Sequence, residues 1–333
     1  MTFSAQAQSP PFTVSKLNIG GEGGTDYITA EPGTGRVFIS RQTHFMVVDG
    51  ASGRILGDIA DTPGTHGAAL AIKSNHGFIT NGGDSTVTMF DLKSLQTIKK
   101  IPVAVGGLDG IMYDASLDRV ILSNHSKPAG TLVALDPTTG AITGTAQLSN
   151  DAPEGAAGDG KGRLFVNLEG SNTIEVVDAK TMKVIADWPI PECSRPTGIA
   201  YDSATNRIFS GCSKTSVVVD AATGSVVATI ANGQGVDALG WDPEQKLLYI
   251  PAGRDGNLTV VHQDDPNHYS VVATVATQNG AKTLSVDTAT HVVYMFAAEY
   301  GPAPAADTSS GPAGGGPPRR GPLIGAWFLA IRH

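Results

Sequence analysis

Six side chains that can bind cations, clamp anions or transfer protons recur at nearly constant spacing along the 333-residue sequence. Carboxylates and imidazoles are the donors that divalent cations use in proteins, and carboxylates held close together raise one another's pKa. The six are Asp26, His66, Asp109, Glu154, Asp237 and Lys282, with Thr197 at the seventh equivalent position. Successive positions lie 40 to 45 residues apart. Their chemistry therefore depends on whether the fold brings these positions together.

A divalent metal site is one interpretation, with His66, Asp109, Glu154 and His125 as ligands. Ca²⁺ or Mg²⁺ is favoured if carboxylates dominate, and a transition metal if histidines do. A second interpretation is a metal-dependent hydrolase or lyase, in which Lys282 or Glu299 acts as acid, base or anion clamp. A third is that the polar residues bind only water or cap loop amides. A small-molecule ligand would contact Asp26, His66, Asp109, Glu154, Asp237, Lys282 and Glu299.

The spacing comes from a unit that is repeated seven times. It reads as an apolar stretch, an Asp/Gly/Asn turn and a run such as Arg-Val-Phe-Ile, as in segments 25–40, 108–123 and 196–210. Units of this length are typical of four-stranded propeller blades. The alternating and β-branched patterns within each unit predict strands, and almost no helix is expected.

The seventh unit supplies only three strands, the last at 324–332, before the sequence stops. The missing fourth strand is predicted at 12–19, ahead of the first unit. This pairing closes the ring and removes an open sheet edge. We therefore expect an all-β, seven-bladed β-propeller with four-stranded antiparallel blades, the last closed by the N-terminal strand. The first strand of each blade is innermost, so the six chemical side chains should converge at one mouth of the central channel.

The repeat also resembles a known family. Segments 195–227 (RPTGIAYDSATNRIFSG…VVVDAATGSVV) and 108–136 are similar to the YVTN, or YncE-like, β-propeller repeat, and the similarity spans 12–333. It implies a seven-bladed and usually exported bacterial propeller, and it implies little about chemistry. The sequence departs from the pattern at His262, where a third strand should end in Asp, and at a long insertion in the seventh unit.

The two cysteines flank one predicted blade. Cys193 precedes the first strand of the fifth blade and Cys212 follows its second strand, so both belong to the same rim. Adjacent loops can reach the Cα separation that a disulfide requires, and we expect a bridge between them. A bridge is consistent with an oxidising compartment, the periplasm or the exterior; the alternative is two free thiols in the cytoplasm.

Two segments are expected to lie outside the repeats. Residues 1–11 form an N-terminal tail in which Ala5-x-Ala7 resembles the end of a removed export signal. Residues 299–323 form a Pro/Gly-rich loop insertion on the mouth side, which serves either as a functional lid or as plain disorder. Within it, Arg319 and Arg320 either reach over the acidic mouth or keep the loop soluble.

Composition excludes several classes of function. The formal net charge is −8 without basic blocks, which argues against nucleic acid as a partner. No apolar run approaches the roughly 18 residues of a membrane span. No P-loop is present, and Gly233-x-Gly235-x-x-Ala238 precedes a strand, so no nucleotide cofactor is expected. The sequence thus predicts an exported monomer whose acidic mouth binds a small ligand or one divalent metal ion, or meets a protein partner. Catalysis is left open.

Overall fold

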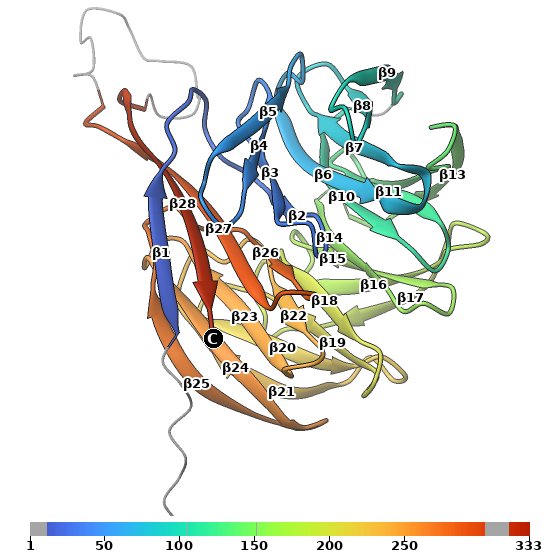
Figure 1. The fold of residues 1–333 in the computed structure, drawn as a ribbon. Helices are drawn as coiled ribbons and strands as arrows, with labels where there is room; N and C mark the ends of the chain where they lie inside the picture. Colours follow the sequence, from blue (N-terminus) through green and yellow to red (C-terminus); the bar gives the residue numbers. More distant parts are fainter. Residues whose placement is uncertain (1–11, 105, 151, 304–319) are drawn as a thin grey trace, which may run out of the picture.

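The computed structural model describes residues 12–104, 106–150, 152–303 and 320–333, and it confirms the seven-bladed β-propeller. Seven four-stranded antiparallel sheets are arranged around a central axis (Figure 1). In the described ranges, helix is limited to one 3₁₀ turn, η1 (Ile72–Ser74). The predicted tail at 1–11 and most of the loop insertion, 304–319, lie outside the described residues.

In six blades the strands pair in chain order from the axis outward, and in the seventh the N-terminal strand takes the outermost place. The first strands are β2 (Ile28–Ala30), β6 (Thr65–Ala71), β10 (Leu108–Asp114), β14 (Pro153–Gly158), β18 (Ile199–Asp202), β22 (Gly240–Asp242) and β26 (Leu284–Asp287). The second are β3 (Arg36–Ser40), β7 (His76–Asn81), β11 (Arg119–Asn124), β15 (Arg163–Leu168), β19 (Arg207–Ser210), β23 (Leu247–Ala252) and β27 (Val292–Tyr300). The third are β4 (Phe45–Asp49), β8 (Thr86–Asp91), β12 (Thr131–Leu135), β16 (Thr173–Asp178), β20 (Thr215–Asp220), β24 (Asn257–Asp265) and β28 (Leu323–Arg332). The outer strands are β5 (Ile55–Ile59), β9 (Thr97–Pro102), β13 (Ile142–Gln147), β17 (Lys183–Pro189), β21 (Val226–Ala231), β25 (His268–Ala276) and β1 (Thr13–Asn18).

The hydrophobic core lies between neighbouring blades. Second and third strands such as β3 and β4 are buried along nearly their whole length, whereas outer strands such as β17 alternate between exposed and half-buried residues. Apolar side chains on both faces of the inner strands therefore pack against two neighbouring blades. Phe209 and Trp241, for example, bring blades five and six together with their ring centres 4.8 Å apart. Such packing is the main stabilising term in a fold that is almost entirely sheet.

The ring is closed by its first and last strands. β1 runs antiparallel to β28 from Thr13 opposite Arg332 to Asn18 opposite Trp327, and the two lie side by side in Figure 1. The fully buried Arg41 secures the chain that follows β1, because its guanidinium donates to the carbonyls of Gly20, Gly21, Gly23 and Gly24. It also lies 4.8 Å from the ring centre of Phe296. The closure predicted for segment 12–19 is thus confirmed.

Two details differ from the predicted repeat. In blade six, the third strand does not end at His262 but continues to Asp265, where the side chain caps the turn by accepting from the Asn267 amide at 2.8 Å. In blade seven, Glu299 belongs to β27 and Leu323 begins β28, so the insertion spans 301–322. Its base is fixed by a 2.8 Å hydrogen bond from the Gly301 amide to the Pro322 carbonyl.

Candidate functional site

The first strands set the positions of the recurring side chains. His66, Asp109 and Glu154 are each the second residue of their strand, while the other four residues lie just before theirs. First strands of neighbouring blades contact one another around the axis. Backbone hydrogen bonds between them include Tyr27 to His66 at 3.3 Å and Asp237 to Lys282 at 3.2 Å. The seven equivalent positions therefore surround one mouth of the channel.

Glycines permit this close approach. Four of the seven recurring residues are followed by glycine, and a Cβ at Gly198 would lie 2.2 Å from the Ala238 carbonyl carbon in the next blade. A Cβ at Gly155 would lie 2.9 Å from the Thr197 carbonyl oxygen. A larger residue would force the blades apart, since real side chains do not tolerate such distances. The repeat Gly thus sets how tightly the mouth residues are gathered.

Four of these side chains and His125 form a continuous chain of contacts that we call the carboxylate–imidazole arc: Asp26, His66, Asp109, His125 and Glu154. His66 Nδ1 lies 2.6 Å from Asp26 Oδ2 and 3.4 Å from Asp109 Oδ1. His125, from the loop after β11, places Nε2 3.3 Å from Asp109 Oδ2 and 3.5 Å from Glu154 Oε1. Asp109 thus lies between two imidazoles, and one network joins four blades.

The arc consists of two sets of candidate metal ligands that share Asp109. In each set, Asp26–His66–Asp109 and Asp109–His125–Glu154, one donor atom per residue lies within 4.8 Å of the others. His125 Nε2 is buried and has no hydrogen-bond partner. Glu154 is only 7% exposed, and its carboxyl group makes no hydrogen bond among the described residues. A buried nitrogen without a hydrogen bond is costly, and a bound cation would satisfy His125 Nε2.

Burial and neighbouring charge perturb the ionisation of the arc. Burial raises the pKa of Glu154 to about 9, and the charges of Asp109, Asp237 and Glu169 add to this effect. Burial likewise raises the pKa of Asp109, against the opposing effects of the two histidines. The pKa of Asp26 is lowered, because the hydrogen bond from His66 and the charge of Lys282 outweigh its burial. The same hydrogen bond raises the pKa of His66 despite its burial. Without a cation, the mouth therefore holds its protons tightly at Glu154.

Lys282 continues the chain of contacts beyond Asp26. Its Nζ lies 3.2 Å from Asp26 Oδ1 and 2.5 Å from Asp237 Oδ2. Burial lowers the pKa of Lys282, but the charges of Asp237 and Asp26 outweigh this effect and raise the pKa above its ordinary value. Lys282 is therefore an ammonium ion at neutral pH and is suited to hold charge rather than to remove a proton.

Glu299 does not join the arc. It accepts a 2.5 Å hydrogen bond from the Trp327 indole, and it contacts none of the recurring side chains among the described residues. Arg320, at the end of the insertion, lies with its guanidinium carbon 5.1 Å from the ring centre of Tyr300, while Arg319 lies outside the described residues. The sequence placed Glu299 on the correct rim, but its side chain packs within blade seven.

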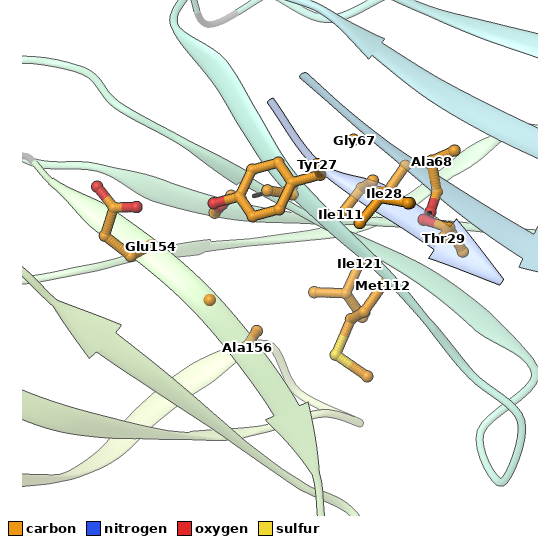
Figure 2. Close-up of a pocket in the computed structure, with 13 residues that line it drawn as sticks. Tyr27, Ile28, Thr29, Gly67, Ala68, Ile111, Met112, Ile121, Glu154 and Ala156 are labelled. Atoms are coloured by element: carbon orange, nitrogen blue, oxygen red, sulfur yellow. Dashed lines mark hydrogen bonds between the residues drawn. The ribbon is translucent and has the colours of Figure 1, made fainter. Parts of the chain in front are cut away.

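A small cavity of about 150 Å³ lies in the channel beneath the arc. Figure 2 shows the Tyr27 ring extending across it with the hydroxyl toward Glu154, above Ile111, Ile121 and Met112. Tyr27 occupies the position that glycine fills in blades two to five. Burial and the surrounding carboxylates hold its pKa well above the ordinary value, so the phenol stays neutral. Comparing the residue after each recurring position would have singled it out.

The predicted disulfide is confirmed. Cys193 and Cys212 are fully buried and bonded to each other, with their Cα atoms 5.5 Å apart. The bridge joins the loop before β18 to the loop after β19, both on the mouth side. It is consistent with an extracellular or periplasmic location. No helix in the described ranges has the length and hydropathy that a membrane crossing needs.

Solved structures share this fold, although their sequences are distant. A chain of the hydrazine synthase of Kuenenia stuttgartiensis is 18% identical with a TM-score of 0.73, covering 82% of this chain and 92% of that one. A chain of the mitotic checkpoint complex is 15% identical with a TM-score of 0.74, covering 89% and 92%. The WD40 repeats of RRP9 are 9% identical with a TM-score of 0.77, covering 96% and 97%.

The class of protein is therefore a seven-bladed β-propeller, and this fold by itself does not imply a function. No protein-family model matches the sequence and no curated protein does, so the resemblance to the YVTN, or YncE-like, repeat is not confirmed. The likenesses among solved structures establish the architecture alone. Function has to be argued from the side chains at the mouth.

Proposed function

We propose that this propeller binds a divalent metal ion in the carboxylate–imidazole arc and presents it to a small ligand or partner entering the mouth. The observation that carries the proposal is the position of Asp109, between His66 and His125 and shared by both candidate ligand sets. His125 Nε2 is buried and makes no hydrogen bond, although it lies 3.3 Å from Asp109 Oδ2 and 3.5 Å from Glu154 Oε1, and this supports a ligand at this point.

The donors favour an ion that accepts both oxygen and nitrogen. Each set offers two carboxylates and one imidazole, which suits Mn²⁺ or Zn²⁺ better than the all-oxygen preference of Ca²⁺ and Mg²⁺. Metal binding must displace the protons held by Glu154 and His66. The affinity is therefore expected to increase as the pH rises from 5 to 8.

Lys282 would act beside the metal as a positive clamp. Its two carboxylate contacts and raised pKa support this role over that of a base. Glu299, the other candidate for acid–base chemistry, is engaged by Trp327. The metal-dependent hydrolase or lyase therefore gains no specific support from the geometry, and binding is the function we advance.

We further infer that the protein works outside the cytoplasm. The buried Cys193–Cys212 bridge supports an oxidising compartment. The resemblance of the repeat to the YVTN, or YncE-like, pattern points the same way. A periplasmic or secreted metal-binding propeller is the role consistent with both observations.

Calorimetric titration of chelator-treated protein with Mn²⁺ and Zn²⁺ tests the proposal. We expect saturable binding by the wild type and a loss of affinity on the order of 100-fold or more in Asp109→Asn, since removing even an outer-shell partner costs about 10- to 100-fold. Asp118→Asn is the matched control, because Asp118 lies in an exposed turn on the opposite rim at φ 49°, which Asn tolerates. Folded wild type that binds neither ion, or equal binding by Asp109→Asn, would contradict the proposal.

A further inference from the structure

A second, larger pocket opens on the other side of the same mouth. It has a volume of about 820 Å³ and lies among the mouth-side loops of blades four to seven. Its size is within the range of small-molecule sites, roughly 300–1,000 Å³. Four cationic side chains line it, and we call them the cationic arc: Arg195, Lys214, Arg254 and Lys282.

The charges in this pocket do not cancel. Two carboxylates also line it, and each already has a cation: Arg195 Nη2 lies 2.6 Å from Glu169 Oε1, and Lys282 contacts Asp237. The side chains of Lys214 and Arg254 make no hydrogen bond or ion pair among the described residues, and both are exposed. The pocket therefore carries two uncompensated positive charges in a chain whose net charge is −8.

The loops that carry three of these cations are fixed by the disulfide and by backbone hydrogen bonds. The Cys193–Cys212 bridge joins the loop that carries Arg195 to the loop that carries Lys214. The Arg254 amide donates to the Gln234 carbonyl at 3.0 Å, and its carbonyl accepts from Asn279 Nδ2 at 2.9 Å. Fixed loops lower the entropy lost when a ligand is bound, because fewer residues have to be ordered.

We propose that this pocket binds a small anion carrying two or more carboxylate or phosphate groups. One anionic group pairs with Arg254 and another with Lys214, the two lining cations that have no carboxylate partner among the described residues. Guanidinium groups bind both kinds of oxyanion through paired hydrogen bonds, so the shared chemistry is a polyanion. An anion with a single charge would neutralise only part of the excess positive charge and would fill little of the pocket volume.

The anion site goes beyond the metal site and does not require it. Among the described residues, Lys282 lines this pocket and also contacts the carboxylate–imidazole arc through Asp26. An anion bound here would lie next to the metal ion, whose position rests on the proposed function. The two sites can therefore be tested separately on the same protein.

The test is calorimetric titration in EDTA with propane-1,2,3-tricarboxylate and, separately, fructose 1,6-bisphosphate. We expect at least one probe to bind the wild type, and the tighter one distinguishes carboxylate from phosphate. The double variant Arg254→Ala/Lys214→Ala should weaken that binding by about tenfold or more, since it removes charge-assisted hydrogen bonds. The matched double variant Arg54→Ala/Lys93→Ala, with both residues exposed on the opposite rim, should bind like the wild type.

The outcomes separate the two proposals. Failure of both probes to bind folded wild type, or equal binding by Arg254→Ala/Lys214→Ala, overturns the anion site. The Asp109→Asn variant should bind the anion as the wild type does in EDTA, and a loss of binding in that variant would also overturn this assignment. Failure of Mn²⁺ and Zn²⁺ to bind, with anion binding intact, overturns only the metal proposal.

Discussion

The two sides of the mouth are built on the same backbone and carry opposite chemistry. The carboxylate–imidazole arc occupies blades one to four, where half-buried acids and imidazoles and the buried Glu154 contact one another over 2.6 to 3.5 Å. The cationic arc occupies blades five to seven, where exposed Lys214 and Arg254 surround an open pocket. The repeat thus fixes where a side chain lies, and the residue type at that place sets which ligand it favours.

Burial separates the arcs as clearly as charge does. Glu154 is 7% exposed, and its pKa responds strongly to desolvation. Lys214 and Arg254 are exposed, so water screens their charges. The first arc is therefore suited to a small ion that can replace buried protons, and the second to a larger ligand that brings its own charge. Lys282 belongs to the boundary, because it contacts Asp26 on one side and Asp237 on the other.

Removing the disulfide should produce the largest effect and should affect the arcs unequally. Replacing both cysteines by alanine is expected to lower the free energy of unfolding by about 3 kcal/mol, the typical value for a loop of this length. The loops carrying Arg195 and Lys214 would lose their link, so polyanion affinity should fall while Mn²⁺ affinity is unchanged. Urea unfolding and calorimetry measure these quantities. An equal loss in both affinities would show that the arcs are not independent.

Removing the charge at the boundary should have the next largest effect. Lys282→Met leaves Asp26 and Asp237 without their shared cation, and we expect the free energy of unfolding to fall by about 2 kcal/mol. The loss is smaller than for a fully buried ion pair, because the Lys282 side chain is half-exposed and water screens its charge. Urea unfolding at pH 7 measures it. Lys180→Met, at an exposed turn of blade four, is the control. Stability equal to the wild type would mean that water already screens both carboxylates.

The last predicted effect depends on pH and concerns the carboxylate–imidazole arc alone. The pKa of Glu154 is about 9 in the folded, metal-free protein, well above that of an unfolded glutamate. The folded state therefore binds the extra proton, and the wild type loses stability as the pH rises between those values. Relative to the wild type, Glu154→Gln should become steadily more stable as the pH rises from 5 to 8, because glutamine has no proton to lose. Urea unfolding in EDTA at both pH values checks this difference, and an advantage that is the same at both would contradict the raised pKa.

The regular parts of the molecule were predictable from the sequence. Blade number, the closure by segment 12–19 and the disulfide all follow from the repeat and from which loops share a rim. The convergence of Asp26, His66, Asp109 and Glu154 follows as well, because strand pairing fixes where the first strands point.

The irregular parts were not predictable in the same way. Arg195 and Lys214 lie in loops, where spacing says which rim a residue occupies but not which way its side chain points. Glu299 shows the same limit, since it sits on the expected rim and yet turns to the Trp327 indole. The length of β24 depends on Asp265, which moves the turn three residues beyond His262. The orientation of these side chains and the end of β24 depend on contacts with particular partner residues, and the repeat pattern does not specify those contacts.

The closure of the ring has a practical consequence for attaching this protein to a surface. Phe12 and His333 stack with their ring centres 4.6 Å apart, at the end of blade seven farthest from the loop at 301–322. An anchor fused at either position would hold the protein by the rim opposite the mouth. The immobilised molecule would then expose both arcs to the surrounding solution, and one tether point would serve a sensor surface or a pull-down resin equally well.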